Sequence, residues 1–192
     1  LENALINLDC NRKGVNSVSY IMGQSLESTI SNGIVIGDVS MDELLGIVEQ
    51  HVANGCKRIK LKVSPRDGYE RTRLVRDAYP ELALAVDANQ SYTYDQLDMV
   101  AAYNDLNLLC IEEPFSMTNL TTYKAWKESL PNWPITTSIC LDESILSYDD
   151  LSYAIEYRLI DVLNVKVGRL GGLIQTRAAI LRCREAGIPY WI

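Results

Sequence analysis

The sequence predicts an α/β fold, a (β/α)8 barrel of the TIM type that is incomplete in this chain. From about residue 30 onward, short runs rich in aliphatic and β-branched residues alternate with helical patterns, the order typical of βαβ units around a parallel sheet. Several of the predicted strands end on a charged side chain. We count about seven strands, whereas a closed barrel has eight, so the chain is expected to cover about strands 1 to 7.

The first unit shows how the elements are assigned. Residues 33–37 (GIVIG) form a short apolar run, after which Ser40 and Glu43 have the spacing of a capping box at a helix start. That helix is predicted to run to about residue 54, with Gly55 as its left-handed stop. The same pattern then repeats along the chain. Strands are predicted at 57–63, 82–89, 108–114, 135–144, 161–168 and 188–192, and helices at 67–79, 93–104, 123–130, 148–157 and 173–186.

Residues 1–30 fit this alternation poorly. Residues 1–10 (LENALINLDC) predict one helix and residues 17–24 (SVSYIMGQ) a second, short one, with Gly14 and Gly23 as breaks. We therefore divide the chain into a helical lead-in, residues 1–30, and a partial barrel domain, residues 31–192.

Composition excludes several classes of function. The net charge is −7 and the basic residues are scattered, so nucleic acid is not an expected partner. No apolar run approaches the roughly 20 residues of a membrane span, and the first residues lack the order of a signal peptide. The five cysteines form no CxxC pair and are expected to be reduced core thiols. These features favour a cytoplasmic protein that does not bind membranes.

Five predicted strands carry a titratable residue at or near the C-terminal end. These are Lys62, Asp87, Glu112, Asp142 and Lys166, which are spaced by about one βα unit each. The active site of a TIM barrel lies at the C-terminal mouth and takes residues from several strands. The spacing therefore predicts that all five side chains meet in one place.

The alternation of side chains along each strand supports this prediction. Large aliphatic residues occupy one face of each strand, while small or polar residues, including all five charged ones, occupy the other. The sixth strand, for example, places Asn164 on the same face as Lys166. Charges that converge in a barrel interior must be paired or bind a metal ion. Three carboxylates without a histidine or thiolate ligand favour Mg²⁺, with Mn²⁺ or Ca²⁺ as alternatives. The other interpretation of these charges is that they form salt bridges at the barrel mouth without a metal ion.

The same segments resemble the muconate-lactonising subgroup of the enolase superfamily. The likeness lies in KLK (60–62), VDAN (86–89), IEEP (111–114), LDES (141–144) and NVKVGRLGG (164–172). Together with EAGIPYW (185–191), these motifs look most like the o-succinylbenzoate synthases and the N-acylamino acid racemases. Glu113 stands where many relatives have Gln, and Val167 where Pro is common.

The resemblance implies a role for each matching position. It makes Asp87, Glu112 and Asp142 ligands of Mg²⁺, with Mn²⁺ as a substitute, and Lys62 and Lys166 catalytic groups on opposite faces of the substrate. Lys60 lies two residues before Lys62 on the same strand face, so its positive charge is expected to help Lys62 act as a base. Asn89 and Glu143 would lie beside the metal ligands.

The resemblance also implies a lyase or isomerase that acts on a small-molecule carboxylate. In a Mg²⁺-dependent o-succinylbenzoate synthase, a lysine removes a proton α to the carboxylate, and loss of water follows, as a step of menaquinone biosynthesis. In an N-acylamino acid racemase or dipeptide epimerase the same proton is replaced from the other face. The dehydration and the racemisation each need both lysines, so the presence of the two lysines does not distinguish these reactions. A barrel fragment without catalysis is the alternative of another class. A capping domain before residue 1 is expected, and a homo-oligomer remains open.

Overall fold

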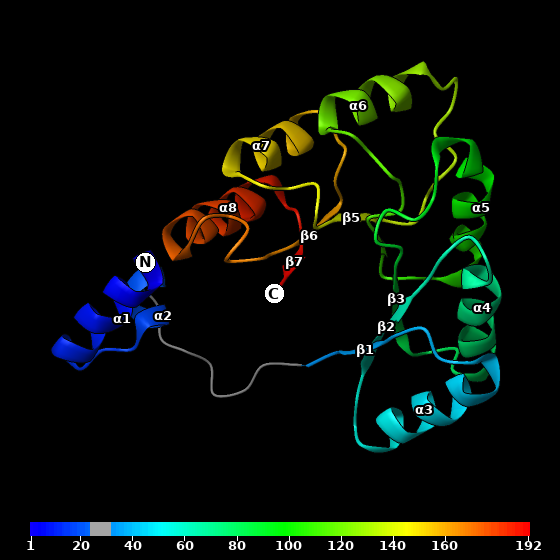
Figure 1. Ribbon diagram of the computed structural model, residues 1–192, viewed down its shortest axis with the longest axis horizontal. Helices are drawn as coiled ribbons and strands as arrows, with labels where there is room; N and C mark the ends of the chain where they lie inside the picture. The colour runs from blue at the N-terminus through cyan, green and yellow to red at the C-terminus, as the bar shows by residue number, and fades with distance from the viewer. Residues whose placement is uncertain (24–31) are drawn as a thin grey trace.

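The computed structural model describes residues 1–23 and 32–192. Seven parallel strands form one sheet in the order β1-β2-β3-β4-β5-β6-β7, curled into an incomplete barrel. The helices lie along the outside of this arc and the strands along its inside (Figure 1). The predicted fold class is therefore confirmed. The strands are β1 (Ile34–Ile36), β2 (Arg58–Lys62), β3 (Ala83–Asp87), β4 (Ile111–Glu112), β5 (Ile139–Leu141), β6 (Val162–Asn164) and β7 (Tyr190–Trp191).

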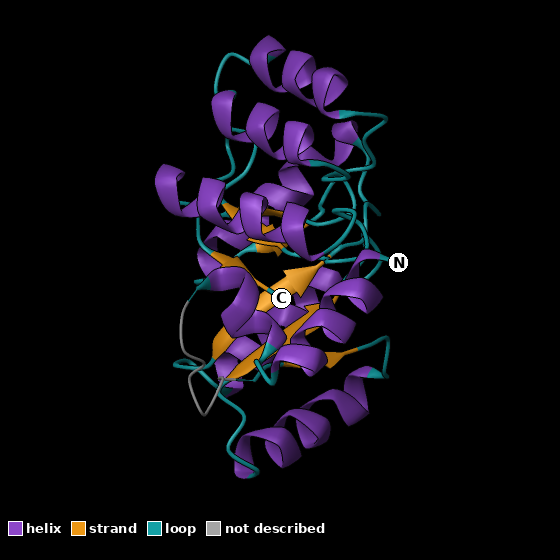
Figure 2. Cartoon of the chain, turned by 90° about the vertical axis from the view of Figure 1, so that its left-hand side faces the viewer, coloured by secondary structure: helices purple, strands orange, loops and turns teal. Residues whose placement is uncertain are grey.

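Helices connect successive strands and cover the outer face of the sheet, as Figure 2 shows from the side. The first connection begins as predicted, because the Glu43 carboxylate accepts a hydrogen bond from the Ser40 backbone N–H, and Gly55 has a φ of 84°. The helices are α1 (Glu2–Lys13), α2 (Ser17–Met22), α3 (Met41–Ala53), α4 (Gly68–Ala78), α5 (Leu97–Ala101), α6 (Leu120–Ser129), α7 (Tyr148–Glu156) and α8 (Leu173–Ala186), with 3-10 turns η1 (Tyr94–Gln96) and η2 (Ala102–Leu106).

The two faces of the sheet bury different side chains. The main core lies between strands and helices and takes the large aliphatics, among them Ile59, Leu84 and Leu163. A second, small cluster lies on the inner face and consists of Ala85, Cys110, Cys140 and Val162, with Trp191 packed against it. The predicted alternation of faces is confirmed, and the inner face is the one that leads to the charged strand ends.

Several predicted elements differ from the structure. The strands predicted at 108–114 and 161–168 are reduced to Ile111–Glu112 and Val162–Asn164, and the helix predicted at 123–130 is Leu120–Ser129. The helix predicted at 93–104 is divided into η1, α5 and η2, and the chain then turns at Asn107, which has a φ of 46°. The strand predicted at 135–144 is only three residues long. Thr136 and Thr137 donate their backbone N–H groups to Asn104 Oδ1, at 2.8 and 3.0 Å, instead of to a neighbouring strand. A side chain from η2 therefore delays the start of β5.

The N-terminal helices pack against the end of the barrel domain, with α2 next to α8 (Figure 1). Gly14 and Gly23 end α1 and α2 in the left-handed conformation, as predicted. The side chains of Glu2 and Asn3 accept hydrogen bonds from Ile174 N–H and Leu173 N–H, at 3.0 and 3.3 Å. Helix α1 therefore caps the N-terminus of α8. Residues 24–30 of the predicted lead-in lie outside the described residues, and the division at residue 30 stays a prediction.

None of the helices that the structure describes has the length and apolar character needed to span a membrane.

Candidate active site

Two lysines on the inner face of β2 pair with carboxylates of the next two strands. Strands β2, β3 and β4 are in parallel register, with Lys62 opposite Asp87 and Asp87 opposite Glu112. Lys60 Nζ lies 2.9 Å from Glu112 Oε2 and 3.2 Å from Asp87 Oδ2. Lys62 Nζ lies 2.7 Å from Asp87 Oδ2 and also donates to Asn89 Oδ1. One ammonium group, that of Lys60, thus contacts both carboxylates.

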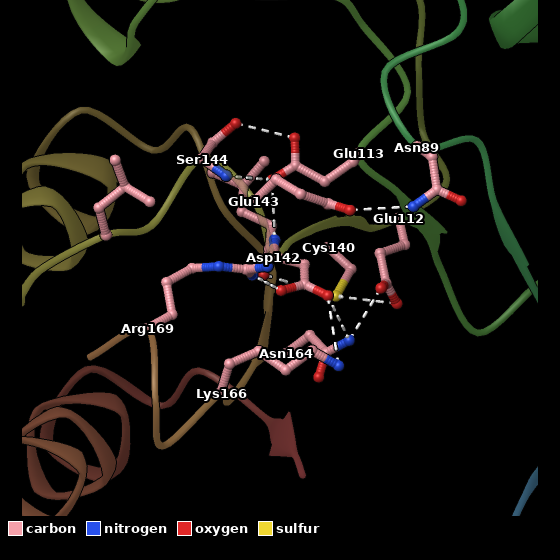
Figure 3. Close-up of polar contacts among 12 residues, drawn as sticks. Asn89, Glu112, Glu113, Cys140, Asp142, Glu143, Ser144, Asn164, Lys166 and Arg169 are labelled. Atoms are coloured by element: carbon pink, nitrogen blue, oxygen red, sulfur yellow. Dashed lines mark hydrogen bonds and ion pairs between the residues drawn. The ribbon is translucent and has the colours of Figure 1, made fainter. Parts of the chain in front are cut away.

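The third carboxylate joins the same cluster through Asn164 of β6. Asn164 Nδ2 donates to Glu112 Oε1 at 2.8 Å and to Asp142 Oδ2 at 3.1 Å. Lys166 Nζ lies 3.4 Å from Asp142 Oδ2, and the Arg169 guanidinium donates to Asp142 Oδ1. Figure 3 shows these groups pointing toward one another from the ends of β4, β5 and β6.

The structure therefore brings together all five of the charged residues that strand spacing predicts. The side chains of Asp87, Glu112 and Asp142 are 2%, 1% and 7% exposed, whereas those of Lys62 and Lys166 are 37% and 45% exposed. The carboxylates form the floor of the cluster, and the two lysines reach solvent. Both lysine side chains are therefore accessible to solvent.

Asn89 and Glu143 lie next to this cluster, as the resemblance implied. Asn89 Nδ2 donates to Glu143 Oε1 at 2.9 Å, which joins the loop after β3 to the loop after β5. The backbone N–H of Asn89 also donates to Asp87 Oδ1 at 3.1 Å. Asn89 thus contacts the cluster directly, and Glu143 is joined to it through Asn89.

Three residues at the cluster were given no role from the sequence. Asn164 shares the inner face with Lys166, so the alternation along β6 could have identified it. Arg169 lies in the loop after β6 and reaches back to Asp142. Alternation places Glu113 on the helix side of β4, but its φ of 41° is left-handed, and its buried carboxylate binds the loop after β5. No local sequence signal identifies Arg169 or Glu113, because each acts on a residue about one βα unit away.

Burial and ion pairing act in opposite directions on the buried charges. Burial lowers the pKa of Lys60, but its contacts with Glu112 and Asp87 outweigh burial, so the pKa is raised overall. Burial raises the pKa of Asp87, but Lys62 and Lys60 outweigh it, and the pKa is lowered overall. For Glu113, burial dominates and raises the pKa, in spite of hydrogen bonds from Ser144. Lys60 and Asp87 are therefore held in their charged forms.

The carboxylates fit a divalent cation in chemistry, but cationic side chains hold them in this structure. Among residues 1–23 and 32–192, no three His, Cys, Asp or Glu side chains form a group that could hold a metal ion. Each carboxylate instead faces a lysine, an arginine or the Asn164 amide. The donor set contains only carboxylates, which hard cations such as Mg²⁺ prefer. In addition, the buried Asn164 Oδ1 has no hydrogen-bond partner in the part of the chain that the structure describes. The metal site stays a prediction.

A cavity of about 180 Å³ adjoins the cluster on the concave side of the sheet. Strands β1, β2, β6 and β7 line it, and Lys60, Asn164 and Lys166 are among its residues. Arg58 lies across it, with its guanidinium 4.8 Å from the ring centroid of Trp191. The inner space of the sheet is therefore continuous with the charged cluster.

Comparison with known proteins gives consistent results. Residues 43–192 match the family described as Enolase C-terminal domain-like. The chain is 35% identical over 192 residues to an o-succinylbenzoate synthase of Geobacillus kaustophilus, covering 100% of this chain and 49% of that protein. It is 36% identical over 169 residues to an N-succinylamino acid racemase of Thermus thermophilus, covering 88% of this chain and 44% of that protein. The chain thus spans about half the length of these relatives.

Solved structures share the fold. A protein from Enterococcus faecalis, named an unknown member of the enolase superfamily, has a TM-score of 0.89 at 28% identity, covering 99% of this chain and 50% of that chain. A dipeptide epimerase from Methylococcus capsulatus, complexed with Mg ion, has a TM-score of 0.80 at 25% identity, covering 97% and 54%. The family match spans most of the residues, and the TM-scores show that these neighbours share the fold of this chain. The chain therefore belongs to the Enolase C-terminal domain-like family, and its seven strands are part of an enolase-type barrel.

Proposed function

We propose that the protein carrying this chain is a Mg²⁺-dependent o-succinylbenzoate synthase that removes a proton next to a substrate carboxylate. The observation that carries the proposal is the placement of two exposed lysines on either side of three buried carboxylates. Lys62 ends β2 and Lys166 follows β6, while the carboxylates come from the three strands between them. A flat substrate above the carboxylates would present one face to each lysine.

In this proposal Asp87, Glu112 and Asp142 hold the metal ion. Their all-oxygen donor set and burial support a hard cation, and Mn²⁺ has the same preference for oxygen ligands. When bound, Mg²⁺ supplies positive charge that compensates the charge gained by the substrate carboxylate as the α-proton leaves. With the metal ion bound, Lys62 and Lys166 would face the substrate, and the charge of Lys60 would help Lys62 act as a base.

The lysines carry the proton transfers. Lys62 removes the α-proton and returns it to the departing hydroxyl group as water is lost. Lys166, on the opposite face of the substrate, stabilises by its positive charge the negative charge that the substrate gains. Product formation by this route would place the protein in menaquinone biosynthesis. Residues 1–30 would connect the barrel to a capping domain, and the contacts of Glu2 and Asn3 with α8 support close packing of that lead-in on the barrel.

A racemase is the second candidate, because the Thermus thermophilus relative at 36% identity is named an N-succinylamino acid racemase. The same two lysines suffice: one removes the α-proton and the other delivers a proton from the opposite face. A dipeptide epimerase would use the same arrangement.

The test compares the two reactions in the intact protein with Mg²⁺. Formation of o-succinylbenzoate from its hydroxylated precursor would support the synthase. Exchange of the α-proton of N-succinylamino acids with D₂O, without that product, would support the racemase instead. Lys62→Ala and Lys166→Ala should each reduce the rate by about 10²- to 10⁴-fold. Lys57→Ala, which removes an exposed lysine at the opposite end of β2, is the matched control. If the folded protein catalyses neither reaction, and does not epimerise dipeptides either, catalysis is refuted and the non-catalytic barrel remains.

A further inference from the structure

We propose that Glu113 is a positioning residue that holds Asp142 in place relative to Glu112 and so sets the metal affinity of the site. The inference rests on the proposed function, since it takes these two carboxylates as metal ligands. It concerns five side chains at the ends of β3, β4 and β5, which we call the rim clamp. The rim clamp consists of Asn89, Gln90, Glu113, Glu143 and Ser144.

Glu113 accepts four hydrogen bonds, and all four come from other loops. Its Oε1 accepts from the backbone N–H groups of Asp142 and Ser144, at 2.8 and 2.7 Å. Its Oε2 accepts from Ser144 Oγ at 2.8 Å and from Gln90 Nε2 at 3.1 Å. Figure 3 shows the contacts between Glu113 and the Asp142 to Ser144 segment. Glu113 is fully buried, so water cannot easily replace it as an acceptor for these donors.

The backbone of the rim clamp is strained in a way that these contacts explain. Asn89, Gln90 and Glu113 have φ values of 44°, 60° and 41°, in the region that side chains with a Cβ rarely adopt. Only two further non-glycine residues among those described, Asn107 and Arg158, share this region. The Gln90 N–H also donates to the Glu113 backbone oxygen at 2.7 Å. Such strain persists where surrounding contacts over-determine the conformation, and it is concentrated at functional sites.

Each proposed metal ligand is a close chain neighbour of a rim clamp residue. Glu113 follows Glu112 directly, and its carboxylate binds the backbone N–H of Asp142. Asn89 lies two residues after Asp87 and contacts Glu143, which follows Asp142. The three carboxylates come from different strands, so their separation depends on such links between loops. Mg²⁺ requires nearly ideal octahedral positions for its ligands, so a small shift of Asp142 weakens binding.

Mn²⁺ binding to the intact protein, measured by the loss of the free Mn²⁺ electron paramagnetic resonance signal, tests the inference without an activity assay. Glu113→Leu should weaken binding by about 10- to 100-fold, the effect usual for residues that orient metal ligands. Glu113→Gln should bind Mn²⁺ much more tightly than Glu113→Leu, because the amide oxygen still accepts from Asp142 and Ser144. Ser144→Ala removes a single donor to Glu113 and should cause a smaller loss of affinity.

Asp161→Leu is the matched control. Asp161 Oδ2 accepts from the Ile139 backbone N–H at 2.8 Å, so it holds the opposite end of the same strand, β5. As long as it is folded, this variant should bind Mn²⁺ with the same affinity as the parent, even if its free energy of unfolding is lower. Hydrogen exchange at the Asp142 and Ser144 amides should accelerate in Glu113→Leu and not in Asp161→Leu.

The outcomes separate the two proposals. A folded parent that binds no Mn²⁺ refutes the metal site and with it the proposed function. If the parent binds Mn²⁺ and Glu113→Leu binds it equally tightly, the positioning role alone is refuted. The positioning role also fails if Asp161→Leu weakens binding as much as Glu113→Leu, or if Glu113→Gln binds no better than Glu113→Leu. If Glu113→Leu does not fold, unchanged binding in Ser144→Ala decides against the role, and weaker binding supports it.

Discussion

Removing the charge of Lys60 should destabilise the metal-free protein strongly. Lys60 Nζ lies 3.0 and 2.9 Å from the two carboxylate oxygens of Glu112 and 3.2 Å from Asp87 Oδ2. The Lys60 side chain is 17% exposed and that of Glu112 is 1% exposed, so water screens the pair poorly. Lys60→Met keeps most of the apolar stem but leaves the Glu112 carboxylate with Asn164 as its main donor. Breaking a buried pair by removing one partner costs about 3 to 5 kcal/mol.

Urea unfolding in the presence of EDTA measures this loss directly. We expect the free energy of unfolding of Lys60→Met to fall by about 3 to 5 kcal/mol, and that of Lys60→Arg to fall less because the charge remains. Added Mg²⁺ should stabilise Lys60→Met more than the parent, because two carboxylates have lost a neutralising amine. The pH–rate profiles of Lys60→Met and the parent should also differ if the Lys60 charge assists Lys62 as a base. Stability in EDTA within about 0.5 kcal/mol of the parent would refute the reasoning.

Three further predictions concern contacts outside the charged cluster. Glu2→Ala should lower the free energy of unfolding by about 1 kcal/mol, because Ile174 N–H at the start of α8 loses its acceptor. Urea unfolding checks this, with Asp42→Ala, which removes an exposed acid in α3, as the control variant. Arg76→Lys should destabilise by about 2 kcal/mol, since a single amine cannot reach the five backbone oxygens that the guanidinium contacts, among them Leu106 O and Leu82 O at 2.8 and 2.9 Å; an unchanged urea midpoint would contradict it. Burial raises the pKa of Cys183 to about 11, so the folded state favours the protonated thiol. This contribution to stability is present below about pH 9 and is lost as the pH rises toward 11. Slow labelling of Cys183 by iodoacetamide in the native protein at pH 8.5, and fast labelling of the same thiol in urea, would support this prediction.

Much of the fold could be predicted because the signals are local. The Ser40 and Glu43 capping box, the left-handed Gly55 and the ends of α1 and α2 depend on residues a few positions apart. The boundaries of β5 and of η2 could not be predicted, because the Asn104 side chain accepts from Thr136 and Thr137 more than 30 residues later. Local propensity contains no information on that contact.

The candidate site divides in the same way. Spacing and alternation were sufficient to bring Lys62, Asp87, Glu112, Asp142 and Lys166 together, because every strand of a parallel barrel ends at the same rim and side chains alternate between its faces. They could not identify which cation faces which carboxylate. Lys60 bridges Asp87 and Glu112.

The amino-acid sequence alone determined the order of strands and helices, the inner face of the sheet and the set of charges at its mouth. Each of these follows from the period of side chains along a strand or helix, which is a property of neighbours in the chain. The tertiary structure alone decided that Glu113 turns along the rim to Ser144, that Arg169 reaches back to Asp142 and that α1 caps α8. These contacts form because curling the sheet brings distant loops within hydrogen-bond range, and buried polar groups must then find partners there.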